Sequence, residues 1–226
     1  MSDTFAAAWL IARKDLAIEF RTRSAFLAAV VFALLGLVIF YYAWDPTAVA
    51  AIDLAPGVLW VIFTFSGILG LNRSFAIESA DHAIDGLLAS PISRESIFLG
   101  KALANLVFIA AVQLIAIPAL AIFYNLPLQH IALPLLGLAF LAAIGLVAVG
   151  TLFSAMAVNT RLAELLLPML ALPFFVPIVM SAAQATSKLL SGRPLSEAAA
   201  WIKLLVAFDL VFVVACALAY PFTVED

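Results

Sequence analysis

Residues 71–101 read LNRSFAIESADHAIDGLLASPISRESIFLGK, and they form the longest polar interval in a chain that is otherwise almost entirely apolar. A helix over about 75–89 would place the acids Glu78, Asp81 and Asp85 on neighbouring turns. Gly86 and Pro91 are expected to end it, because glycine favours helix ends and proline disfavours helical geometry in the residue before it.

The same predicted helix has an apolar face beside its acids, formed by Ile77, Ala80, Ile84, Leu87 and Leu88. Three neighbouring carboxylates repel one another, so the acidic strip is destabilising unless it faces cations. Two interpretations remain open. The helix either docks its acids into a basic groove of a soluble partner, or lies solvated on the bilayer.

The composition on either side of this interval is typical of an integral membrane protein. Of 226 residues, 66% are hydrophobic and 11% are charged, and the mean hydropathy is +1.20, which excludes a water-soluble globular protein. The only cysteine, Cys216, lies in an apolar run, so one chain cannot form a disulfide framework. Charges among the first 23 residues argue against a secretory signal.

Six segments are apolar over the roughly 20 residues that a spanning helix needs, namely 24–43, 56–75, 98–124, 131–157, 162–183 and 200–220. If all six span, eight cations fall on one side: Arg13, Lys14, Arg21, Arg23, Arg73, Arg94, Lys101 and Arg161. Lys188, Arg193 and Lys203 fall on the other. Because Lys and Arg are enriched on the cytoplasmic side, both termini and residues 72–101 are predicted to be cytoplasmic, and the segment 184–199 external.

Residues 1–23 are predicted to form an amphipathic helix in the membrane interface. Its apolar stripe consists of Phe5, Trp9, Ala12, Leu16 and Phe20, with Lys14 and Arg21 on the far side. The alternative is a plain cytosolic extension of the first span. The expected fold is therefore an all-α membrane protein with six spans, an interfacial helix and a cytoplasmic coupling helix between spans 2 and 3, forming a single domain over 1–226.

Asp209 falls near the middle of the sixth span, where a lone carboxylate costs at least about 2.5 kcal/mol. It should therefore face protein or water, or be protonated, and Lys203 lies on another face of the helix. A buried structural hydrogen bond and a place on a transport pathway are both open. The fifth span contains Pro168, Pro173 and Pro177, which predict a kinked or locally unwound helix and a candidate gate.

Sites for nucleotide, metal or heme are weakly indicated. Gly100 and Lys101 precede Ala102 and lack an upstream glycine, so they form no phosphate-binding loop, and any ATP hydrolysis is expected in another chain. Asp81 and Asp85 lack the further polar residues of a metal-dependent phosphotransferase. His130, at the edge of the fourth span, is a weak candidate for an axial ligand of heme iron, because a lone histidine at a helix start is more often an interfacial polar residue.

Several strings, in order along the chain, resemble the heme exporter protein B family, the CcmB-type permeases of the cytochrome c maturation ABC transporter. They are ARKDL at 12–16 with Glu19 and Arg21, PGVLW at 56–60, GLNRSF at 70–75, GLL at 86–88 with Pro91, and FLGKALAN at 98–105. The GLL and proline segment is common to the wider ABC-2 permease superfamily, whereas the first string together with LNRSF at 71–75 and FLGK at 98–101 is more specific. Ser79 and Ala89 stand where acidic or bulkier residues are usual in the family.

The resemblance implies a bacterial inner-membrane permease that docks an ABC ATPase subunit through Glu78, Asp81, Asp85, Gly86, Leu87, Leu88 and Pro91. It also implies a second permease copy, a multi-span heme-handling protein, a small single-span subunit and a heme chaperone. Heme would be the cargo of the complex, with ATP bound by the partner and no catalytic site in this chain. Direct heme translocation and release of the heme-loaded chaperone both remain open.

Three other functions compete with this one. They are an ABC-2 permease for another lipid-like or hydrophobic substrate, an intramembrane enzyme, and a passive scaffold that anchors the ATPase. The family strings weigh against the first, and the missing constellation of polar residues weighs against the second.

Overall fold

The computed structural model describes residues 2–80, 92–127, 129, 131–157 and 163–223, with the backbone alone described at 2–3, 73–80 and 163–165. Within this part of the chain there are seven α-helices and no strand, which confirms the all-α class. The helices are α1 (Ser2–Thr22), α2 (Ser24–Ala43), α3 (Ala51–Ala80), α5 (Arg94–Tyr124), α6 (Ala132–Ala157), α7 (Ala163–Leu190) and α8 (Leu195–Thr223).

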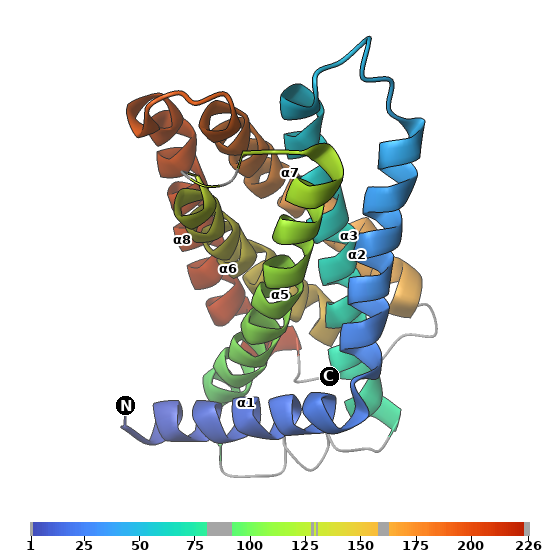
Figure 1. The fold of residues 1–226 in the computed structure, drawn as a ribbon. Helices are drawn as coiled ribbons and strands as arrows, with labels where there is room; N and C mark the ends of the chain where they lie inside the picture. The colour runs from blue at the N-terminus through green and yellow to red at the C-terminus, as the bar shows by residue number, and fades with distance from the viewer. Residues whose placement is uncertain (1, 81–91, 128, 130, 158–162, 224–226) are drawn as a thin grey trace.

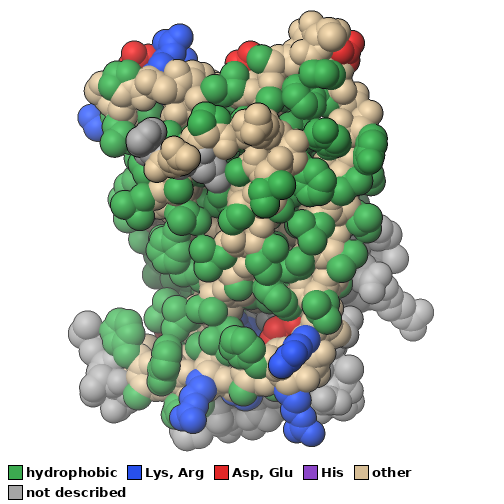
Figure 2. Space-filling view, viewed as in Figure 1, with side chains coloured by type: hydrophobic (Ala, Val, Ile, Leu, Met, Phe, Trp, Pro, Cys, Tyr) green, Lys and Arg blue, Asp and Glu red, His purple; other side chains and the backbone are tan. Residues whose placement is uncertain are grey.

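Six of these helices, α2 to α8, are long and apolar enough to cross a membrane, and this confirms the predicted six spans. In Figure 1 they run together along the long axis of the molecule, while α1 lies across one end of the bundle. Hydrophobic side chains cover the face shown in Figure 2 between the two ends, and Lys, Arg, Asp and Glu gather at the ends. This distribution suits a bundle whose middle lies in hydrocarbon.

Helix boundaries follow local capping rather than hydropathy alone. The helix α5 begins at Arg94, four residues before the predicted start, because the Ser93 side chain caps it by accepting a hydrogen bond from the Ser96 backbone N–H at 3.3 Å. It ends at Tyr124, as predicted, where Asn125 takes a left-handed conformation (φ 50°).

Two connections differ from the sequence prediction. The fifth span was predicted to end at 183 and the sixth to begin at 200, but α7 continues to Leu190 and α8 begins at Leu195, so only a short turn separates the two helices. Gly192 makes that turn with a φ of +67°, and Pro194 precedes α8. The predicted ends of these two spans were wrong because polar residues were taken to lie outside them, whereas Thr186 is buried inside the bundle. The external position of this connection stays a prediction.

The second difference concerns α3, which starts at Ala51, ahead of the predicted 56, and runs without a break to Ala80. Residues 75–80 therefore belong to the end of this spanning helix. They do not begin a separate helix at 75, as the sequence predicted. The remainder of the predicted coupling helix, 81–89, lies outside the described residues. Whether a separate helix docks a partner there stays a prediction.

The core is built around α6, which packs against α5, α7 and α8 and also touches α3. Small residues on α6 let neighbours approach closely: Leu71 of α3 fills the space that a Cβ at Gly150 would need. Large aromatic side chains fill the wider gaps, including the fully buried Trp60, Phe63, Phe98 and Phe175. In contrast, α8 exposes Leu210, Val211, Val214 and Leu218 on its outer face.

Candidate functional site

Asp209 lies inside the bundle, at the place where α8 crosses α6 and α7. Its side chain is only 4% exposed, which agrees with the expectation that it faces protein. Gly145 of α6 makes room for it, because a Cβ at that position would overlap the Asp209 Oδ1 atom and approach Ile178 Cδ1 of α7 to 2.8 Å. Three helices thus meet around one carboxyl group.

Neither carboxylate oxygen of Asp209 has a hydrogen-bond partner among the described residues. Of the two interpretations left open by the sequence, a structural hydrogen bond therefore has no partner in this part of the chain. An ionised carboxylate without a partner is costly in a membrane interior, which makes such a group a candidate for a functional role. Lys203, the nearest cation along α8, is exposed and on another face.

Two hydrogen bonds between buried polar groups join other helices of the bundle. Trp60 of α3 donates its indole N–H to the Thr186 hydroxyl of α7 at 3.0 Å. Gln113 of α5 donates to the Ala139 carbonyl of α6 at 3.1 Å. Hydrogen bonds of this kind help to fix helix packing in membranes, by about 0.6–2 kcal/mol each. Asp209 differs from these residues in lacking such a bond.

The helix α7 contains all three predicted gate residues, Pro168, Pro173 and Pro177, yet it is continuous from Ala163 to Leu190. The local unwinding offered as one alternative is not found. Pro173 is exposed and the other two are half-buried, so their rings lie largely away from the packed face. The Pro177 carbonyl accepts a hydrogen bond from the Ser181 hydroxyl at 2.7 Å, which adds a side-chain bond to the backbone ladder near this proline.

A second polar site joins α1 to α5. The Lys101 ammonium, 1% exposed, lies 3.6 Å from the Asp15 carboxylate, and Lys14 contacts the other Asp15 oxygen at 3.1 Å. At the preceding position of α5, a Cβ at Gly100 would come within 2.7 Å of both the Ala8 carbonyl oxygen and Ile11 Cβ. The absence of a side chain at Gly100 therefore lets α1 lie directly on α5.

This contact brings together two of the strings that carry the family resemblance, 12–16 and 98–105. Both strings are recognisable in the sequence, but their contact was not predicted. The sequence did contain a sign of this contact. A lysine at the start of an apolar span needs a carboxylate if it is buried, and Asp15 is an acid on an otherwise apolar face of the first helix.

The predicted apolar stripe of α1 is divided by the packing. Ala12 is fully buried against α5, whereas Phe5, Trp9 and Phe20 are exposed. Exposed aromatic residues on a helix that lies across the end of a spanning bundle suit an interfacial position. That position for residues 1–23 stays a prediction.

The predicted docking residues are mostly outside the described part of the chain. Only the backbone of Glu78 is described, in the last turns of α3. Outside the described residues lie Asp81, Asp85, Gly86, Leu87, Leu88, Pro91 and the candidate heme ligand His130. Among the residues described, no three His, Cys, Asp or Glu side chains gather closely enough to hold a metal ion.

Comparison with known proteins gives a consistent result. A family model described as CcmB protein matches residues 6–226. Heme exporter protein B of Pseudomonas aeruginosa is 27% identical over 210 residues, which cover 93% of this chain and 92% of the relative. Heme exporter protein B of Bradyrhizobium diazoefficiens is 28% identical over 203 residues, covering 89% and 90%. That of Rhodobacter capsulatus is 29% identical over 171 residues, covering 76% and 78%.

Proposed function

Because this chain belongs to the CcmB protein family, we propose that it is the permease subunit of an ABC transporter that exports or delivers heme for cytochrome c maturation. The observation that carries the proposal is the extent of the match. It runs from residue 6 to residue 226 and includes all six membrane-spanning helices. The relatives named heme exporter protein B are matched over most of their own length.

The permease would sit in the bacterial inner membrane with α1 and both chain ends in the cytoplasm. The distribution of cations supports this orientation, because Lys and Arg are enriched on the cytoplasmic side. The α1 end of the bundle carries Arg13, Lys14, Arg21, Arg23, Arg94 and Lys101, and the opposite end has Lys188, Arg193 and Lys203. In a Cys216→Ala background, a cysteine at Ser79 should label only after the cell is opened. A cysteine at Thr47 should label from outside. Labelling of Ser79→Cys in intact cells would reverse this topology.

ATP hydrolysis would belong to a partner ATPase that docks on the coupling segment 72–101. We expect Glu78, Asp81 and Asp85 to face basic residues of that subunit, next to the turn formed by Gly86, Leu87, Leu88 and Pro91. One exposed ion pair at the edge of an interface contributes about 0–1 kcal/mol to binding. Like charges that face each other at several points of an interface weaken binding by several kcal/mol. Reversing all three acids to lysine should therefore release the ATPase on purification.

The matched control for that variant is Glu197→Lys, an exposed acid at the opposite end of the bundle. It should keep the ATPase. Retention of the ATPase by the triple variant, at normal membrane levels, would assign the contact to the apolar face of the segment instead. Further partners in the proposed complex are a second permease copy, a multi-span heme-handling protein, a small single-span subunit and a heme chaperone.

The function itself is tested by deleting the gene in its host. We expect covalently bound heme to disappear from c-type cytochromes, while b-type cytochromes, which bind heme without covalent attachment, remain. The full-length chain supplied in trans should restore the c-type signal. Normal c-type cytochromes in the deletion strain would refute the proposal and favour a permease for another hydrophobic substrate.

A further inference from the structure

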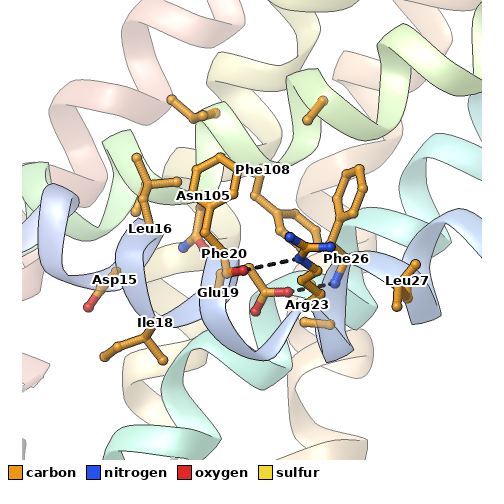
Figure 3. A pocket seen from close by; sticks show the side chains of 15 residues that line it. Asp15, Leu16, Ile18, Glu19, Phe20, Arg23, Phe26, Leu27, Asn105 and Phe108 are labelled. Carbon is orange, nitrogen blue, oxygen red and sulfur yellow. Dashed lines mark hydrogen bonds between the residues drawn. The ribbon is translucent and has the colours of Figure 1, made fainter.

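A cavity of about 410 Å³ lies between α1, the start of α2 and α5, beside the turn that joins α1 to α2 (Figure 3). We propose that this cavity binds one acyl chain of a phospholipid, with an anionic headgroup held at Arg23. The inference is independent of heme transport, so its failure would leave the proposed function untouched.

The cavity exists because the two halves of α1 meet the bundle differently. Near its start, Ala8 and Ile11 press directly on Gly100 of α5. At its end, Arg23 adopts a left-handed conformation (φ 54°) and turns the chain into α2. The Glu19 carboxylate then accepts a hydrogen bond from the Phe26 backbone N–H at 2.8 Å, in the first turn of α2. This turn leaves a space between the second half of α1 and α5.

The walls of the cavity are apolar and are held in place by packing. They include Leu16, Phe20, Phe26, Leu27, Val107 and Phe108. The Phe26 and Phe108 rings meet edge to face, with centroids 6.2 Å apart. Gly70 of α3 is essential to this arrangement, because the Phe108 ring occupies the place where a Cβ at Gly70 would stand. A volume of this size falls within the roughly 300–1,000 Å³ of ligand sites in proteins.

Arg23 is the one cation among the three charged side chains of described residues that line the cavity. Two acids line it, but Asp15 is paired with Lys14 and Lys101, and Glu19 caps α2. Arg23 is exposed, and its Nε donates to the Phe20 carbonyl at 3.3 Å. No carboxylate of the described residues lies within 4 Å of its guanidinium. A guanidinium with free donors beside an apolar cavity suits a phosphate group whose chain enters that cavity.

Two features favour a phospholipid over an iron porphyrin. The lining residues that the structure describes include no His, Cys, Met or Tyr, the side chains that serve as axial ligands of heme iron. The rim is also continuous with exposed apolar surface, through Phe20 (72% exposed) and Leu27 (55% exposed). A lipid can therefore reach the cavity sideways, from the bilayer in which the spans lie.

The test uses the full-length chain in nanodiscs of equal phosphatidylglycerol and phosphatidylcholine, followed by gentle release and native mass spectrometry. The expected result is one retained phosphatidylglycerol for each chain. Arg23→Gln should lower the preference for phosphatidylglycerol over phosphatidylcholine about tenfold, the loss of one charge-assisted contact. Arg13→Gln, which changes an exposed arginine of α1 outside the cavity, should leave the preference unchanged.

Occupancy itself is tested by filling the cavity. Ala111→Phe places a ring inside it, and Gly70→Ala pushes the Phe108 ring into it, so both should abolish the retained lipid. Ala215→Phe, at an exposed position of α8, is the matched control and should retain it. Thermal unfolding of each variant identifies any that fail to fold.

Three results would overturn the proposal. The first is wild-type protein that retains no lipid. The second is retention that neither Ala111→Phe nor Gly70→Ala affects, since such lipid is bound elsewhere. The third is added hemin that displaces the lipid from wild-type protein but does not bind to Ala111→Phe, which would make the cavity a porphyrin site.

Discussion

Lys101 and Asp209 are both charged residues by type and both are almost completely buried, at 1% and 4% exposure, yet their surroundings differ. Lys101 lies at the end of the bundle, where Asp15 of α1 is 3.6 Å away. Asp209 lies within a spanning helix, beside Gly145, and no described residue gives it a hydrogen bond. The two side chains are buried to nearly the same extent, so they differ in whether an oppositely charged or hydrogen-bonding group lies beside them. A paired group holds helices together, whereas an unpaired one is available for another purpose.

The largest effect is expected from Lys101→Glu. It removes the buried cation and places a second carboxylate beside Asp15, and breaking a buried ion pair costs about 3–5 kcal/mol. We expect a large fall in the thermal unfolding temperature and loss of the contact between α1 and α5. Adding Asp15→Lys to this variant should recover part of the stability, because it restores opposite charges. An unchanged unfolding temperature in Lys101→Glu would show that the pair does not hold α1.

A smaller loss of stability is expected from Gly145→Ala. The added methyl group overlaps Asp209 Oδ1 and crowds Ile178, and overpacking of this kind costs about 1–3 kcal/mol. Gly137→Ala, on the same helix with nothing within 4 Å of the new Cβ, is the control and should be tolerated. Combining Gly145→Ala with Asp209→Ala should relieve the loss. If it does not, the close approach at Gly145 is not what limits the packing of α6 against α8.

Asp209→Asn should leave stability equal or higher, since it removes an ionisable group that has no described partner. A place for Asp209 on the transport pathway, the other alternative that the sequence left open, instead predicts a loss of function. Covalent heme in c-type cytochromes should fall to the level of the deletion strain while the variant reaches the membrane in normal amounts. Normal cytochrome c production in Asp209→Asn would reduce the residue to a structural role and remove the contrast with Lys101.

The smallest effect is expected from Glu197→Gln. Arg193 and Glu197 form an ion pair at 2.9 Å, four residues apart, with about half of each side chain exposed. Pairs of this kind contribute about 0.3–0.5 kcal/mol in exposed helices, and added salt weakens them further. The unfolding temperature should therefore change little. A fall in unfolding temperature as large as that of Lys101→Glu would mean that exposure does not determine how strongly an ion pair stabilises this protein.

Much of the fold could be predicted from the sequence, because runs of apolar residues set the spans. The segment 24–43 coincides with α2, and 131–157 nearly coincides with α6. The burial of Asp209 also follows from the cost of a charge in hydrocarbon. Helix ends were less predictable, since capping by Ser93 and the left-handed Asn125 depend on local geometry.

Contacts between distant segments were not predictable from the sequence. A buried Lys101 needs a carboxylate, but a single sequence does not say which acid supplies it, because Asp15 stands 86 positions earlier. The cavity beside Arg23 depends on a positive φ at a residue other than glycine, which is uncommon. Its walls come from four separate places in the chain, and only the folded arrangement brings them together.

The hydrogen bond between Trp60 and Thr186 also provides a spectroscopic reporter. The Trp60 indole is almost fully buried between α3 and α7, and its N–H is bound to a single hydroxyl. In a chain whose other tryptophans, Trp9, Trp44 and Trp201, are replaced by phenylalanine, all indole fluorescence would come from this position. Separation of α3 from α7 during a transport cycle would admit water to the ring, and the emission would shift to longer wavelength. The protein therefore carries its own optical probe of motion between two of its spanning helices.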